Sequence, residues 1–171
     1  FANGVLQTSL EQIAQEAQVT RGAVYWHFAN KAELFRALHE SVRLPQEDLI
    51  ESAVAEGHPD PLALLERVAL ECLELISTDE RRWRVYTILL VRFEAVGEMI
   101  EAVQRQREAH VRMHNNLVRV FELAEESRAL QSRWAPETAA WTFGSMMGGL
   151  ITNWLRQDRN FDVVAIGSAC I

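Results

Sequence analysis

Residues 19–35 gather side chains that can bind phosphate and read the edges of bases. The stretch reads VTRGAVYWHFANKAELF and holds one Arg, an adjacent Tyr and Trp, a His and the only Lys of the chain. An arginine can donate two hydrogen bonds to one guanine, and Tyr, Trp and His can donate to phosphate oxygens. The set therefore has the chemistry of a DNA-reading surface.

The spacing of these residues indicates how a helix would present them. On a helix that starts at Thr20, Val24 and Phe28 share one face. Ala23 lies between them and Val19 leads in from the turn, so we expect this face to pack in the core. The opposite face carries four residues at positions i, i+1, i+4 and i+5, namely Arg21, Gly22, Tyr25 and Trp26.

The aromatic pair admits two interpretations. Tyr25 and Trp26 could pack against the rest of the chain, which is the ordinary role of large aromatic side chains. Two neighbours favour DNA reading instead. Gly22, a poor helix former, leaves room for the backbone to approach DNA closely. Lys31 adds a positive charge at the start of the following helix, whose N-terminus also attracts phosphate.

Helical patterns on either side place this stretch in a helix-turn-helix, in which the second helix enters the major groove. TSLEQIAQEA predicts a helix with Thr8 or Ser9 as its N-cap, and QVT separates it from the next helix as a short turn. Asn30 can cap a third helix. The apolar residues that recur at helical spacing are Leu10, Ile13, Ala14 and Ala17 in the first helix and Leu34, Phe35 and Leu38 in the third.

The pattern changes near residue 44, where long amphipathic helices replace the short ones. Pro45 must kink or restart the helix that Asn30 caps. EGHPDP is a break, after which Asp60 can cap a helix with Pro61 at its first position. Strand-like alternation is almost absent, so the sequence predicts an all-α fold. The helices expected here cover about 61–77, 79–94 (with a capping box from Ser77 to Glu80), 97–126, 136–157 and 162–171.

Composition and motifs exclude several classes of protein. The net charge of −7 has the wrong sign for a protein that coats nucleic acid, so DNA binding must use a local surface. No apolar run approaches the roughly 20 residues of a membrane span, and we expect a cytoplasmic protein that does not contact a membrane. Cys72 and Cys170 form no CxxC motif, and His110 and His114 have no third ligand nearby, so we expect no metal and no cofactor. Without a nucleophile elbow, phosphate loop or dinucleotide motif, we do not expect an enzyme.

Residues 8–42, TSLEQIAQEAQVTRGAVYWHFANKAELFRALHESV, resemble the DNA-binding module of the TetR family of repressors. The similarity is closest to the repressors of multidrug efflux pumps, the branch that includes AcrR and TtgR. It extends to DERRWRVYTILLVRFEAVGEM and MMGGLITNWL later in the chain. It implies a helix-turn-helix module at 1–44, with FANGV as the end of a largely missing first helix. A helical ligand-binding and dimerisation domain would follow at 45–171.

The resemblance implies a repressor that binds double-stranded operator DNA as a homodimer through its last two helices and is released by a hydrophobic, aromatic effector. There are two alternatives to this function. One is a constitutive DNA-binding protein of the same fold without an inducer, and the other is an enzyme that uses the helical pocket. The DNA-binding residues expected are Thr8, Ser9, Thr20, Arg21, Gly22, Tyr25, Trp26, His27 and Lys31. The pocket residues expected, of which about half would be ordinary core, are Leu65, Val68, Cys72, Tyr86, Leu89, Leu90, Met113, Leu117 and Met147.

Two observations about glycine bear on the resemblance. The family usually has Gly in the turn between the first two of these helices, where this chain has Gln18. A left-handed backbone there would cost about 1–2 kcal/mol, so either the turn differs or the strain is tolerated. Gly144 and Gly148 form a GxxxG pair, which permits close packing of the helix backbone against another helix or around a ligand.

Overall fold

The computed structural model describes residues 8–42, 45–92, 100–127, 129–130 and 133–171. Within these ranges the chain forms nine α-helices and no strand, which confirms the predicted all-α fold. The expected end of an earlier helix, FANGV, lies outside them. The helices are α2 (Leu10–Glu16), α3 (Arg21–His27), α4 (Lys31–Ser41), α5 (Pro45–Glu56), α6 (Pro61–Thr78), α7 (Glu80–Leu90), α8 (Ile100–Glu126), α9 (Pro136–Arg156) and α10 (Val163–Cys170).

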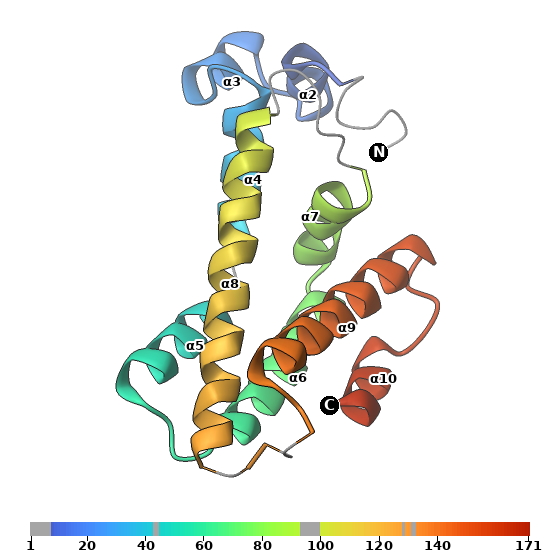
Figure 1. Cartoon of the computed structure of the whole chain (residues 1–171). Helices are drawn as coiled ribbons and strands as arrows, with labels where there is room; N and C mark the ends of the chain where they lie inside the picture. The colour runs from blue at the N-terminus through green and yellow to red at the C-terminus, as the bar shows by residue number, and fades with distance from the viewer. Residues whose placement is uncertain (1–7, 43–44, 93–99, 128, 131–132) are drawn as a thin grey trace.

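The short helices α2 and α3 lie together at one end of the molecule, above a larger helical body (Figure 1). α4 leads from them into the body beside α8, which has 27 residues. In the body, α5, α6 and α9 pack against α8, while α10 packs against α6 and α9. α4 ends at Ser41 and α5 begins at Pro45, so the helix restarts at the proline, one of the two predicted outcomes.

Side-chain caps explain where several helices begin. The Ser9 hydroxyl accepts a hydrogen bond from the Gln12 backbone N–H, while the Gln12 side chain accepts one from the Ser9 N–H. This reciprocal pair is a capping box. The predicted caps Asn30 and Asp60 accept from Glu33 and Ala63 backbone N–H groups at the starts of α4 and α6.

The predicted capping box from Ser77 to Glu80 is wrong. Ser77 donates to the Glu74 carbonyl, and Asp79 caps α7 instead. Asp79 is favoured because one carboxylate oxygen accepts from two backbone N–H groups, those of residues 81 and 82. α7 also ends earlier than predicted, because the Thr87 carbonyl accepts from the N–H groups of both residues 91 and 92. Residues 93 and 94 of the predicted helix, and 97–99 of the next, lie outside the described ranges.

The core that joins α2 to α3 is narrower than predicted. Its members are Leu10, Ala14 and Val24, with Ile13, Phe28 and Leu34 packed against them. Ala17, Val19 and Ala23, expected in this core, are exposed instead. α3 has only seven residues, so the turn around Val24 is the part of it that faces α2. Ala17 and Val19 flank the turn at Gln18 and are exposed there.

The body is held together by buried residues on α6, α8 and α9. Leu73 of α6, Ala124 of α8 and Ala140 of α9 are completely buried. The second half of α8 packs against the first half of α9, where Leu117 and Phe121 meet Ala140 and Phe143. In the part of the chain that the structure describes, no helix is long and apolar enough to cross a membrane.

Gln18 adopts the left-handed conformation, with a φ of 55°. The turn that the resembled family makes with glycine is therefore kept here with a larger residue, and the strain is tolerated. The turn also closes α2, because the N–H of Val19 donates to the Ala14 carbonyl at 3.0 Å. A side chain in this conformation is less stable than in the right-handed region by about 1–2 kcal/mol.

Gln18→Gly is expected to raise the free energy of unfolding by about 0.5–1 kcal/mol, because relief of the left-handed strain exceeds the extra entropy of glycine in the unfolded chain. Chemical denaturation of the full chain measures this. Gln15→Gly is the matched control, since the same change three residues earlier lies inside α2 and should lower stability by about 1 kcal/mol. A loss of stability in both variants would contradict the assigned strain.

Candidate functional site

α3 presents its aromatic residues to solvent. Trp26 is 85% exposed and Tyr25 is 41% exposed, so the alternative in which the pair packs against the body is wrong. The Arg21 side chain is 70% exposed. α3 lies at the outer end of the molecule, in the uppermost part of Figure 1. A large aromatic surface on a short projecting helix has no packing role within the described chain.

The other predicted DNA-binding residues surround this surface. Thr20 caps α3, its hydroxyl accepting from the Ala23 N–H at 3.1 Å. Gly22 is exposed, and a methyl group there would meet only the Thr20 hydroxyl, at 4.0 Å. Packing therefore does not require glycine at this position. His27 is exposed, while Thr8, Ser9 and Lys31 are half-buried at the starts of α2 and α4.

A carboxylate that the sequence did not single out joins two of these residues. Oε1 of Glu11, on α2, accepts a hydrogen bond from the Tyr25 hydroxyl at 3.0 Å. The same oxygen lies 3.0 Å from Nη2 of Arg21. The Arg21 guanidinium also lies over the Tyr25 ring, 5.2 Å from its centroid. Glu11 was missed because its partners are 10 and 14 residues away, across the turn, a spacing that no helical pattern reveals.

The surroundings of Glu11 keep it ionised. A backbone hydrogen bond and then the Tyr25 hydroxyl lower the pKa of its carboxyl, with a further contribution from the charge of Arg21. At neutral pH this group is therefore a carboxylate. It pairs with the one arginine of α3, so the exposed surface carries less free positive charge than the sequence suggests.

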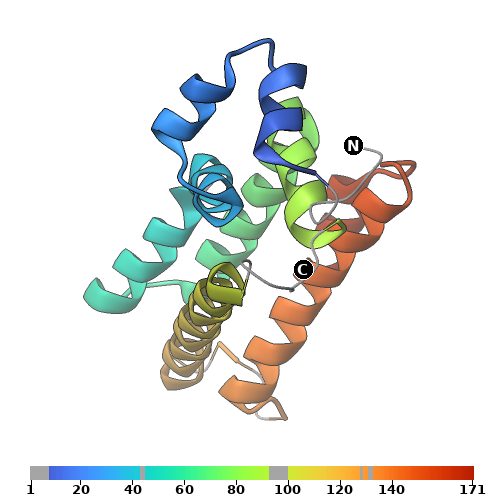
Figure 2. The ribbon, with the colours of Figure 1, turned by 90° about the horizontal axis from the view of Figure 1, so that it is seen from above.

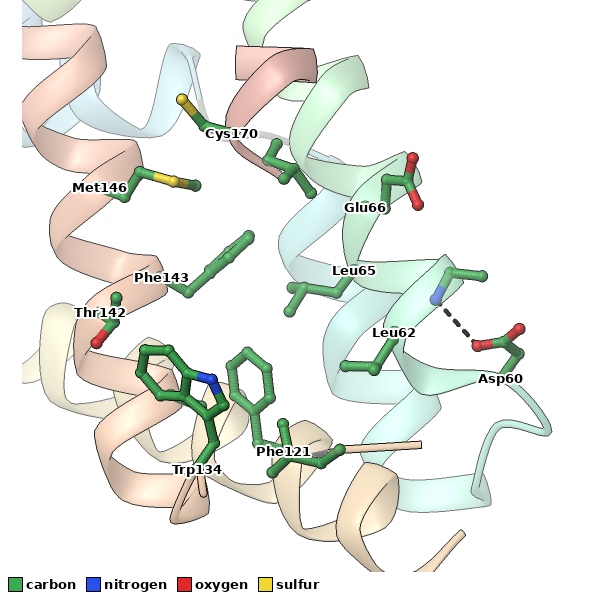
Figure 3. Close-up of a pocket in the computed structure, with 14 residues that line it drawn as sticks. Asp60, Leu62, Leu65, Glu66, Phe121, Trp134, Thr142, Phe143, Met146 and Cys170 are labelled. Atoms are coloured by element: carbon green, nitrogen blue, oxygen red, sulfur yellow. Dashed lines mark hydrogen bonds between the residues drawn. The ribbon is translucent and has the colours of Figure 1, made fainter. Parts of the chain in front are cut away.

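A cavity of about 520 Å³, open to solvent on one side, lies in the body between α6 and α9, near the end of α10. Its wall is largely aromatic and aliphatic, and Figure 3 shows Phe121, Trp134 and Phe143 around it with Leu65 on the facing helix. Asp60 and Glu66 supply carboxylates at the wall, and Asp60 is engaged by the Ala63 N–H. A volume of this size accommodates a drug-sized aromatic molecule.

One of the nine predicted pocket residues, Leu65, lines this cavity. The other eight belong to packed clusters in the body. Val68, Leu117 and Met113 surround the α6–α8 core, and Leu89 packs with the end of α4. Cys72, Tyr86, Leu90 and Met147 pack around Leu73 and Trp154. A ligand role for these eight residues stays a prediction. The cavity aromatics were missed because they come from α8, α9 and the segment between them, which only the fold brings opposite α6.

α9 carries an exposed strip of small residues beside one large one. Among the described residues, a methyl group added at Gly148 or Gly149 would meet no atom beyond its own helix backbone within 4 Å, and one added at Gly144 would touch only Leu117. Trp141, one helical turn further, is 60% exposed. Seen from above, α9 runs along one edge of the molecule (Figure 2). Gly148 thus faces open space on the outside of the body, and a larger side chain there would not fill the cavity.

Arg82 ties α4 to the body. Its Nη1 donates to the Val42 carbonyl, just past the end of α4, at 3.0 Å. Its Nε lies 3.1 Å from Oδ2 of Asp79, the cap of α7. Phe35 and Val42 pack with Val85 and Leu89 of α7 in the same region. A movement of α7 would therefore be passed to α4, and α4 leads to the helix-turn-helix.

Family comparisons cover most of the chain. Residues 1–38 match the family described as "Bacterial regulatory proteins, tetR family". Residues 60–171 match the "MAATS-type transcriptional repressor, C-terminal region". The transcriptional repressor BepR of Brucella suis biovar 1 (strain 1330) is 39% identical over 168 residues, which are 98% of this chain and 80% of BepR.

Solved structures of efflux-pump repressors have the same fold. NalD, the secondary repressor of the MexAB-OprM multidrug efflux pump in Pseudomonas aeruginosa, is 38% identical with a TM-score of 0.81, covering 98% of this chain and 83% of that one. The SmeT–triclosan complex is 25% identical with a TM-score of 0.81, covering 97% and 80% of the two chains. The predicted resemblance to repressors of multidrug efflux pumps is thereby confirmed.

Proposed function

Because the chain belongs to the TetR family of bacterial transcriptional regulators, we propose that it is a cytoplasmic repressor of multidrug efflux genes, and not an enzyme. It binds operator DNA as a homodimer and is released by a hydrophobic, aromatic effector. The observation that carries the DNA-binding part is the exposed surface of α3, where Arg21, Tyr25 and Trp26 project from the end of the molecule. NalD, a repressor of an efflux pump, supports the class of regulated gene.

α3 is the helix that enters the major groove. Arg21 reads a base there, and Gly22 lets the backbone come close to the DNA, since among the described residues a methyl group there would meet only the Thr20 hydroxyl. Thr8, Ser9, Trp26, His27 and Lys31 contact phosphates around the groove, with Lys31 at the N-terminus of α4. The DNA-binding module comprises residues 1–44, and residues 45–171 form the effector-binding and dimerisation domain.

One α3 helix reads too few base pairs for useful specificity. A dimer places two of them in successive major grooves, at a spacing of roughly 34–36 Å or a multiple of it. The dimer forms through α9 and α10, where Gly144, Gly148 and Gly149 let a second copy approach the α9 backbone. Trp141 and Ile166, both exposed, add apolar surface to that face.

The effector occupies the cavity between α6 and α9. Its aromatic wall suits apolar, aromatic compounds, and triclosan in the complex with SmeT is such a compound. An effector releases DNA only if it prefers a conformation in which the two α3 helices are wrongly spaced. The contact of Arg82 with the Val42 carbonyl offers the route from body to α4. The cavity is the observation that favours this function over a constitutive DNA-binding protein.

Arg21→Ala is expected to weaken operator binding by about 1–3 kcal/mol and to relax the base preference at one position of each half-site, because a base contact is lost. Lys31→Ala should instead weaken binding to all duplexes alike and make the salt dependence shallower by about one unit. Titration of a duplex selected from a randomised library, and of its scrambled sequence, measures both. Equal loss on the two duplexes for Arg21→Ala would show that Arg21 does not read a base.

A further inference from the structure

Glu11 lies at the point where α2 meets the DNA-reading face of α3. One of its oxygens takes both the Tyr25 hydroxyl and the Arg21 guanidinium at 3.0 Å. The Tyr25 ring lies against the same guanidinium. Arg21 is therefore held on two sides, by the Glu11 carboxylate from α2 and by the Tyr25 ring from its own helix, α3.

This arrangement orients Arg21 without locking it. A free arginine side chain has about 2 kcal/mol of rotamer entropy, which it loses when it makes a fixed contact. Glu11 and Tyr25 remove part of that freedom before DNA arrives. An exposed ion pair is worth only about 0.2–1 kcal/mol, so a guanine can compete for the guanidinium at little cost. The planar group keeps further N–H donors for a base while Nη2 contacts Glu11.

The same pair reduces attraction to DNA of any sequence. Affinity for random duplex comes from cations that neutralise phosphates, and each such contact steepens the salt dependence by about 0.9. With its charge compensated by Glu11, Arg21 contributes little to this binding. A phosphate, unlike a guanine edge, would also have to approach the Glu11 carboxylate and be repelled by it.

We propose that Glu11 is a specificity-determining positioning residue, which presents Arg21 for base reading and withholds it from phosphates of non-operator DNA. The proposal rests on the proposed DNA-binding function. Tyr25 contributes to this positioning, because its hydroxyl donates to the Glu11 carboxylate and its ring packs against the Arg21 guanidinium. Loss of the carboxylate should therefore strengthen binding to the wrong DNA, which a merely structural role would not do.

The test uses the full chain and two duplexes, one selected by the wild-type protein from a randomised library and one with its sequence scrambled. Glu11→Gln should bind the scrambled duplex roughly 3- to 8-fold more tightly at 0.1 M salt, with a salt dependence steeper by about one. Binding to the selected duplex should not improve, so the ratio of the two affinities falls at least threefold. In an Arg21→Ala background the same substitution should leave the ratio unchanged.

Two matched variants separate position from charge. Glu11→Asp keeps the charge but shortens the reach, so it should lower the affinity ratio as Glu11→Gln does. Glu16→Gln removes the same charge from the other end of α2, where the residue is exposed, and should leave the ratio as in wild type. Thermal unfolding of each variant checks that the fold is retained.

The outcomes distinguish the two levels of the proposal. If the wild-type protein selects no sequence from the library, the proposed DNA-binding function is wrong, and the proposed role of Glu11 is wrong as well. If a sequence is selected but Glu11→Gln keeps the wild-type ratio, only the role of Glu11 is overturned. An effect of Glu11→Gln that persists without Arg21 would also overturn it, by showing that Glu11 reads a base itself. Equal effects of Glu11→Gln and Glu16→Gln on the affinity ratio would overturn it too, by showing that Glu11 acts only through the net charge of the protein.

Discussion

Gly148→Leu is expected to convert the dimer to a monomer and to weaken operator binding by roughly 10²- to 10⁴-fold. The loss is large because the second half-site is bound at a high effective concentration only while the two modules are joined. Among the described residues, a Cβ added at Gly148 would meet no atom beyond its own helix backbone within 4 Å, so a leucine there should leave the fold intact. In the proposed dimer its bulk would separate the two α9 helices, which are proposed to pack through their glycines. Analytical ultracentrifugation and operator titration measure the two effects.

Two variants control this experiment. Ala55→Leu places an additional leucine on the exposed surface of α5, away from α9, and should leave both dimer and operator affinity unchanged. Gly148→Ala should stabilise the isolated helix by about 0.5–1 kcal/mol while disturbing the interface less than leucine does. A Gly148→Leu protein that stays dimeric with wild-type operator affinity would place the dimer interface elsewhere.

Much of the fold could be predicted from the sequence because local chemistry decides it. Ser9, Asn30 and Asp60 begin helices where their side chains can accept backbone N–H groups, and such preferences act within three residues. Where two local caps competed, the prediction failed. Ser77 was predicted as the cap, but Asp79 can also cap a helix, and its carboxylate, which accepts from two N–H groups, occupies the position.

The candidate site likewise has a part that local sequence pattern predicts and a part that depends on the fold. The exposure of Arg21, Tyr25 and Trp26 follows from helical periodicity over a single short helix. Glu11 could not be assigned, because its contact with Arg21 depends on how the turn at Gln18 sets α3 against α2. The cavity is harder still, since Leu65, Trp134 and Phe143 come from three segments and only the packing of α6 against α9 makes them neighbours.

Triclosan, used as a probe effector, is expected to weaken operator binding 5- to 150-fold, equivalent to a coupling of about 1–3 kcal/mol. Such coupling requires a preference of the ligand for the conformation with wrongly spaced α3 helices. By reciprocity, saturating operator DNA must weaken triclosan binding by the same factor. Calorimetric titration of the free dimer and of the operator complex measures both sides of this cycle. Equal affinity of triclosan for the two would contradict the induction mechanism while leaving the DNA-binding function standing.

Phe143→Ala locates the effector within the body. Phe143 lines the cavity, so its loss should lower triclosan affinity by at least tenfold, as expected when about 1.5 kcal/mol or more of buried aromatic contact is removed. Operator affinity without effector should stay as in wild type, because α9, the helix that carries Phe143, lies in the body away from α3 (Figure 1). Leu49→Ala, which removes an exposed apolar side chain from α5, is the control and should keep the full response.

A second substitution distinguishes this cavity from the sequence-predicted pocket. Met147 lies four residues from Phe143 but packs in the cluster around Leu73 and Trp154, with Tyr86 and Leu90. If triclosan occupies the cavity, Met147→Ala should leave its affinity within about threefold of wild type, since the lost contacts are with protein alone. The reverse result, with affinity lost in Met147→Ala and kept in Phe143→Ala, would move the effector to the cluster beside α7. Effector binding would then act directly on the helix whose Arg82 holds the end of α4, and the cavity between α6 and α9 would have no part in release from DNA.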